Sequence, residues 1–204
     1  MIIRSLILFF ISTLLFPQSG KSILTKLQQK YSNIKTFSAS FQQKIKGQNN
    51  FEVNAKGKFY YSQKNKFIIE FNNQVIVSDG NTVWNYNKKS KQVIISSITD
   101  EPTSLSIDRI IYDYPSICNV TLEKNSDKNP AFTVLMLTPK DEDAPFKDVK
   151  IWVTQDYLIN KLEISDLSGS TFIFELSNIE LNKDLSNMDF VFTPPKGVRV
   201  IDLR

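Results

Sequence analysis

The residues from Thr36 onward form a long series of short β-type segments, and this pattern constrains the fold more than any other feature of the sequence. Each segment is rich in β-branched and aromatic residues and is bounded by turn residues. Asp79-Gly80, for example, is a pair that tolerates the positive φ angles of a tight hairpin turn. The predicted segments are 36–47, 53–62, 66–71, 74–78, 82–87, 91–97, 117–124, 131–138, 147–154, 157–165, 170–181 and 189–192. About eleven sequential strands predict one large, curled antiparallel sheet in a mainly β, α+β fold.

Two helices accompany the predicted strands. In the first, Ile23, Leu27 and Tyr31 recur at helical spacing, with polar residues between them. The second lies between the two groups of strands and begins at Asp100-Glu101-Pro102, which suits a helix start. Its apolar residues fall on roughly one side of the helix and are Leu105, Ile107, Ile110, Ile111 and Tyr114. Both helices are expected to pack on the inner face of the sheet.

Several predicted strands are apolar on both faces, although a one-sided sheet should alternate apolar and polar residues. The run 67–71 (FIIEF) places Phe67, Ile69 and Phe71 on one face and Ile68 on the other. Two short helices can bury only part of so wide a sheet. The surplus apolar surface therefore forms either a crowded core or the lining of a cavity for an apolar ligand. The periodicity alone favours the crowded core and leaves the cavity open as the alternative.

The first twenty residues are typical of a secretory signal peptide. Arg4 supplies the positive charge, and the apolar run at 6–16 is too short to span a bilayer comfortably. A retained membrane anchor is the alternative, but no charged stop-transfer flank extends this run. We therefore expect a signal peptide at 1–20 and one exported domain at 21–204.

The composition argues against several classes of function. Histidine is absent, which excludes catalytic triads and zinc sites built on imidazole. The formal net charge of +4 is mild, and no basic stripe with interleaved aromatic residues indicates a nucleic-acid binder. Asp141-Glu142-Asp143 lacks the ligand spacing of a calcium loop, and the single Cys118 is expected to be structural. Without a nucleophile elbow or a phosphate-binding loop, no catalytic residue, metal or cofactor is expected.

Three stretches carry a resemblance to a known family: 37–45 (FSASFQQKI), 75–87 (VIVSDGNTVWNYN) and 192–200 (FTPPKGVRV). Together with the signal peptide, they are ordered and spaced as in the outer-membrane lipoprotein carrier proteins, the LolA-like family. The resemblance implies a periplasmic, unclosed antiparallel β-barrel with a short helical lid over a hydrophobic cavity. It also implies a monomeric, non-enzymatic carrier of acylated lipoproteins. Such a carrier receives its cargo from an inner-membrane ABC transporter and passes it to an outer-membrane receptor lipoprotein.

The resemblance moves the interpretation of the apolar surplus from a crowded core to a cavity. One strand parity would then face the acyl chains, and its residues are Phe59, Tyr61, Phe67, Ile69 and Phe71. The helix at 102–114 would be the movable lid. Family members typically have an Arg-Pro pair before the Phe of the third strand, and that Arg bonds the closed lid; here Gln63-Lys64 is aligned with it. Gln63 is therefore the predicted gating position, with weaker or differently arranged lid closure.

Alternatives to this assignment remain open. Ordinary core packing is the alternative role for each predicted cavity residue. At the level of function, the same open barrel can bind a glycolipid or phospholipid, or sense a partner protein.

Overall fold

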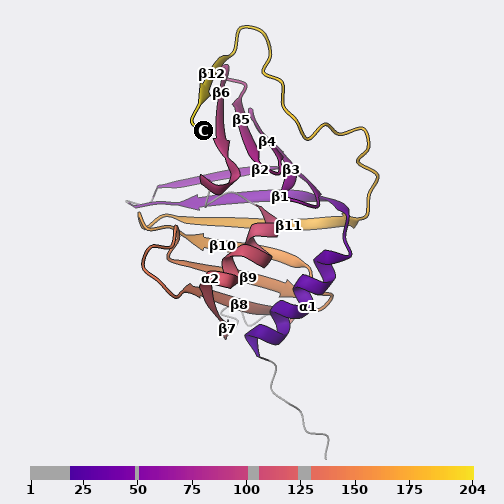
Figure 1. The fold of residues 1–204 in the computed structure, drawn as a ribbon, viewed down its shortest axis with the longest axis vertical. Helices are drawn as coiled ribbons and strands as arrows, with labels where there is room; N and C mark the ends of the chain where they lie inside the picture. Colours follow the sequence, from indigo (N-terminus) through magenta and orange to yellow (C-terminus); the bar gives the residue numbers. More distant parts are fainter. Residues whose placement is uncertain (1–18, 49–50, 101–105, 124–129) are drawn as a thin grey trace, which may run out of the picture.

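The computed structural model describes residues 19–48, 51–100, 106–123 and 130–204 (Figure 1). Twelve strands form a single sheet with the order β12-β6-β5-β4-β3-β2-β1-β11-β10-β9-β8-β7. The sheet is not closed, because β12 and β7 at its two ends do not pair with each other within the described residues. The strands are β1 Thr36–Lys46, β2 Glu52–Ser62, β3 Lys66–Phe71, β4 Gln74–Asp79, β5 Thr82–Asn87, β6 Gln92–Ser97, β7 Cys118–Glu123, β8 Phe132–Pro139, β9 Asp148–Thr154, β10 Ile159–Ser165, β11 Thr171–Leu181 and β12 Arg199–Asp202.

Eleven of the predicted segments are confirmed as strands, with bounds that differ by at most two residues. The predicted strand at 189–192 is wrong, since the last strand is β12, which pairs parallel to β6. Local chemistry explains the failure at 189–192. The N–H of Val191 donates to Asp189 Oδ1 at 2.9 Å, and Pro194 and Pro195 have no N–H to offer a neighbouring strand.

The helices lie together on one face of the sheet (Figure 1). Helix α1 (Gly20–Ser32) begins at Ser19, whose side chain accepts a hydrogen bond from the N–H of Ser22 at 3.2 Å. A 3₁₀ turn, η1 (Ile98–Asp100), follows β6. The predicted middle helix is described from residue 107 as a π-helical turn, η2 (Arg109–Asp113), that continues into α2 (Tyr114–Ile117). None of the described helices is long and apolar enough to cross a membrane.

The sheet buries apolar side chains on both of its faces, as the sequence of β3 indicates. Ile68, Val77, Trp84 and Ile95 are register partners across β3 to β6, so they share the face opposite to Phe67. Three of these four are buried, with Trp84 only partly covered. Residues 182–198, which we call the C-terminal strap, run past this part of the sheet to reach β12 (Figure 1).

A ring contact fixes the strap on this outer face. Phe192 of the strap packs against Tyr86 of β5, with ring centroids 5.3 Å apart. Tyr86 pairs with Val93 of β6, which is fully buried on the same face. The strap thus covers apolar surface that α1 and the lid, on the other face, cannot reach.

Candidate functional site

The predicted cavity residues lie together on the inner face of β2 and β3. Tyr61 is the register partner of Phe67, and Phe59 is the partner of Ile69. All four side chains are 0–3% exposed, and the ring centroids of Phe59 and Phe67 are 6.3 Å apart. Phe71, at the end of β3, is half-buried and packs against the same core. The structure therefore brings the five predicted residues onto one continuous apolar surface.

The inner strands on the other side of β2 extend this surface. Phe37 of β1 stacks on Tyr61 with ring centroids 4.8 Å apart, and Phe41 of β1 lies 6.1 Å from Phe174 of β11. These three rings are buried in the core that contains Phe59 and Phe67. In the sequence, the β1 segment indicates only a family resemblance, and its phenylalanines are not among the predicted site residues.

The lid buries its apolar side against this aromatic wall. Ile107, Ile110, Ile111 and Tyr114 are 0–3% exposed and belong to the same core cluster as Phe59 and Phe67. Leu105, the remaining predicted lid residue, lies outside the described residues. The lid side chains fill the space above this wall.

Three hydrogen bonds join the lid to the β2–β3 hairpin. Asp108 accepts from the Tyr61 hydroxyl at Oδ1 and from the Asn65 N–H at Oδ2, both at 2.6 Å. Ser106 Oγ donates to Asn65 Oδ1 at 2.6 Å. Asn65 has a φ angle of 58°, a left-handed conformation that asparagine tolerates well. We call these four residues the Asp108 latch.

The lid is also bonded to α1. Pro115 has no N–H, so the carbonyl of Ile111 lacks the donor that an α-helix would place four residues later. Gln28 Nε2 of α1 donates to this carbonyl at 2.7 Å. In return, the Tyr112 hydroxyl donates to the carbonyl of Gln28 at 3.1 Å. The side chain of Gln28 in α1 therefore supplies the Ile111 carbonyl with a hydrogen-bond donor where Pro115 has none.

Gln63, the predicted gating position, has a different partner. Its Nε2 donates to the carbonyl of Ser32 at 3.1 Å, at the end of α1 and not on the lid. The lid bonds come instead from Tyr61 and Asn65 in the same hairpin. Asp108 had no role in the sequence-based prediction; the available signal was its carboxylate between the apolar residues Ile107 and Ile110 of the lid.

Arg109 bonds the beginning of the lid to η1, the 3₁₀ turn that follows β6. Its guanidinium donates to the carbonyl of Ile98 and, at 3.5 Å, to that of Thr99. The guanidinium also lies 5.4 Å from the ring of Tyr114.

Burial controls the ionisation of two groups near the lid. Burial raises the pKa of Tyr61 well above its usual value, and the hydrogen bond to Asp108 and the charge of Asp108 raise it further. Tyr61 therefore remains a hydrogen-bond donor in the latch. Burial also raises the pKa of the Cys118 thiol to about 11, so this thiol stays protonated and unreactive. Within the described part of the chain, no three metal-ligating side chains gather at one point.

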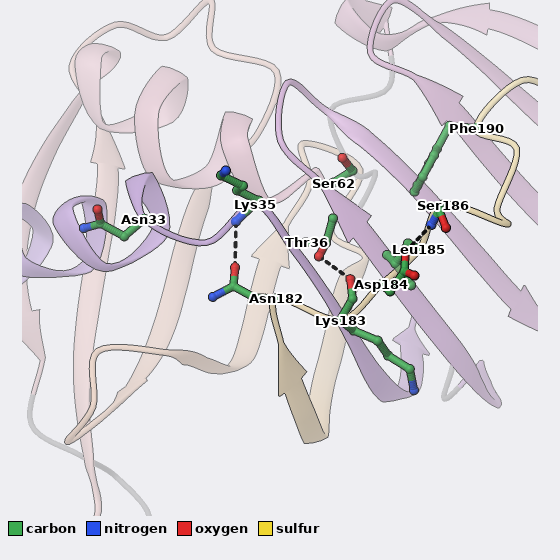
Figure 2. Close-up of a pocket in the computed structure, with 10 residues that line it drawn as sticks. All are labelled: Asn33, Lys35, Thr36, Ser62, Asn182, Lys183, Asp184, Leu185, Ser186 and Phe190. Carbon is green, nitrogen blue, oxygen red and sulfur yellow. Dashed lines mark hydrogen bonds between the residues drawn. The ribbon is translucent and has the colours of Figure 1, made fainter.

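A polar pocket of about 600 Å³ lies elsewhere, between the end of α1, the start of β1 and the C-terminal strap (Figure 2). Thr36 Oγ1 donates to the carbonyl of Lys183 at 2.6 Å, and the Lys35 N–H donates to Asn182 Oδ1 at 3.1 Å. These bonds join the strap to β1. Lys183 and Asp184 on the pocket wall are exposed and opposite in charge, so the wall favours neither a cation nor an anion. Because its hydrogen bonds join the strap to β1, we assign the pocket to strap attachment.

We expect Asp108→Ala to make the lid open more often. The change leaves the Tyr61 hydroxyl and the Asn65 N–H without their shared acceptor, and hydrogen bonds to a charged group contribute about 1.5–3 kcal/mol. Amide hydrogen exchange within residues 109–117 should therefore speed up by about 10- to 100-fold. Asp113→Ala is the matched control, because Asp113 lies on the same lid and is exposed. Equal exchange rates in both variants would rule out the latch.

Comparison with known proteins gives matches over nearly the whole chain. A family model described as "Outer membrane lipoprotein carrier protein LolA" matches residues 32–193. An outer-membrane lipoprotein carrier protein of Francisella tularensis subsp. novicida is 30% identical, over 98% of this chain and 97% of that protein. One of Erwinia tasmaniensis is 28% identical, over 87% of each chain. The crystal structure of an uncharacterized conserved protein from Thermus thermophilus shares the fold, with a TM-score of 0.55. The two sequences are 14% identical, and the match covers 90% of this chain and 98% of that one.

Proposed function

The chain belongs to the outer membrane lipoprotein carrier protein LolA family, and from this premise we propose that it is a periplasmic carrier of lipoproteins. In this role it would shield their acyl chains during transfer from the inner to the outer membrane. The observation that carries the proposal is the aromatic wall around Phe59 and Phe67, which is covered by α1 and by a short lid held through hydrogen bonds. We assign Phe59, Tyr61, Phe67, Ile69 and Phe71 to the acyl-binding surface.

The filled interior supports transfer in preference to storage. Burial of each acyl CH₂ contributes about 0.8 kcal/mol, so a long chain in an empty cavity would be released too slowly. Here Ile107, Ile110 and Ile111 cover the wall when no ligand is bound. An incoming acyl chain must displace these side chains, and they return when the chain leaves. This exchange lowers the net affinity and favours handover to the next protein.

The expected partners and export route are part of the same proposal. An inner-membrane ABC transporter would supply the lipoprotein, and an outer-membrane receptor lipoprotein would accept it. Residues 1–20 would direct export. Ser19 caps α1, and a Cβ at Gly20 would lie only 2.8 Å from the carbonyl carbon of Thr121. Because both residues contact the folded domain, signal cleavage before Ser19 fits the structure better than cleavage after Gly20.

A release assay tests the proposed function. The exported protein is added to inner-membrane vesicles that contain the transporter and a radiolabelled lipoprotein, with and without ATP. We expect ATP-dependent appearance of the lipoprotein in the soluble fraction, in a complex with the carrier. Folded carrier that releases nothing in the presence of ATP would contradict the proposal. A phospholipid or glycolipid as the species bound in native mass spectrometry would support the alternative cargo instead.

A further inference from the structure

Positive charge gathers at one end of the sheet, on two adjacent segments that we call the basic tip. Three of its residues, Lys88, Lys89 and Lys91, lie in the turn between β5 and β6, and all three are exposed. The other two, Lys196 and Arg199, are exposed at the end of the C-terminal strap and the start of β12. The Arg199 N–H donates to the carbonyl of Lys91 at 2.9 Å, which places the two segments side by side.

The basic tip carries more than the whole net charge of the expected mature chain. Residues 19–204 contain 24 basic and 21 acidic residues, which gives a net charge of +3. The five tip residues contribute +5, so the rest of the chain carries −2. Residues 80–99 and 190–201 contain no Asp or Glu. No ion pair among the described residues involves the tip, and this separation of charge orients the molecule tip-first toward a negative surface.

Local hydrogen bonds fix the backbone of the basic tip. Asn87 Oδ1 accepts from the N–H groups of Lys89 and Ser90, each at 3.0 Å. In the strap, the Val198 N–H donates to the carbonyl of Pro195 at 3.3 Å, and Gly197 has a φ angle of 79°. The charged side chains therefore project from two ordered turns, so little backbone entropy is lost when they meet a partner.

Aliphatic side chains are exposed next to these charges. Val200, which follows Arg199, is 47% exposed. Val191, farther back on the strap beside the Phe192–Tyr86 contact, is 52% exposed. Lysines beside small apolar groups match a bilayer surface, where phosphates lie above the first methylenes of the acyl chains. An acidic protein would satisfy the lysines but gives no role to the exposed valines.

We propose that the basic tip docks the protein on anionic phospholipid headgroups at a membrane surface. The inference rests on the proposed function for its setting, since a carrier between two membranes must approach both. Helix α1 and the lid lie away from this end of the molecule (Figure 1). Docking through the tip would therefore leave the lid free to open.

Vesicle sedimentation tests this proposal. The exported protein is mixed with phosphatidylcholine vesicles or with vesicles that contain about one third phosphatidylglycerol, at about 0.05 M and 0.5 M salt. We expect binding to the anionic vesicles at low salt, and its loss at high salt. The triple variant Lys88→Gln/Lys89→Gln/Lys91→Gln should bind at least about tenfold more weakly. The control Lys56→Gln/Lys58→Gln/Lys147→Gln removes the same charge from exposed sites elsewhere.

Several outcomes would overturn the docking proposal. These are equal binding to both kinds of vesicle, unchanged binding of the tip variant, and equal losses in the tip and control variants. Capture of the protein by an acidic partner without vesicle binding would also overturn it.

The vesicle assay contains no cargo or transporter, so it tests docking separately from the carrier function. If the tip does not bind lipid but ATP-dependent release persists, only docking fails; if the tip binds lipid but release is absent, only the carrier function fails.

Discussion

Replacing Phe67 with glutamate is expected to reduce ATP-dependent lipoprotein release to the level seen without carrier. Phe67 is 1% exposed, at the centre of the wall formed by Phe59, Tyr61 and Ile69. A carboxylate there removes one ring and places a polar group where acyl methylenes would lie, and each unburied methylene forfeits about 0.8 kcal/mol. Burial of the carboxyl group without a partner also costs several kcal/mol of folding stability. The readout is the amount of soluble carrier–lipoprotein complex.

Two further variants separate loss of the site from loss of the fold. Phe71→Glu places the same charge on the same face at a half-buried position. This variant should therefore be more stable than Phe67→Glu and still release less lipoprotein than the wild type. Tyr60→Glu places the charge on the opposite face of β2 and should leave release close to the wild-type amount. Folded protein is quantified by circular dichroism before each assay. Normal release by Phe67→Glu or Phe71→Glu would remove these residues from the acyl-binding surface.

Gly57→Ala should cause a large loss of stability, although it adds only one methyl group. A Cβ at Gly57 would lie 1.7 Å from the carbonyl oxygen of Glu70 and 2.8 Å from Cβ of Phe71. The first clash is with backbone, so β2 and β3 must separate locally and weaken their ladder. We expect the free energy of unfolding in urea to fall by about 3 kcal/mol or more.

Gly47→Ala is the matched control for this substitution. The closest atom to its new Cβ would be Cδ1 of Phe51 at 3.2 Å, and that ring is exposed and able to move. We expect its unfolding midpoint to remain close to that of the wild type. If Gly57→Ala unfolds at the same urea concentration as Gly47→Ala, then the close approach of β2 and β3 does not constrain the fold.

Strand positions and strand parity could be predicted because both depend on short-range patterns. Gly80 has a φ angle of 103°, as the predicted Asp79-Gly80 hairpin turn requires. Alternation correctly placed Phe59, Tyr61, Phe67 and Ile69 on one face. Neither result required knowledge of which segments meet in space.

The latch and the strap could not be predicted because they depend on pairs that are distant in the sequence. Asp108 and Tyr61 are 47 residues apart, and no local pattern indicates that they share a hydrogen bond. Phe190 and Phe192 give the strap the composition of a strand, but the Asp189 side chain and two prolines prevent ladder pairing. Gln63 was chosen by its aligned position, and its contact with Ser32 depends on where α1 ends.

The position of the strap at the end of the chain determines when the sheet can be completed. In the proposed role, export would deliver the N-terminus first, so β3 to β6 would reach the periplasm well before the strap and β12. Until residues 182–202 follow, Tyr86 would lack the ring of Phe192 and β6 would lack its parallel neighbour β12. At that stage the nascent chain would expose apolar surface and an unpaired strand edge, both of which promote aggregation. Chaperones or rapid translocation would have to limit this aggregation. Chains cut short near the C-terminus would be held at that stage.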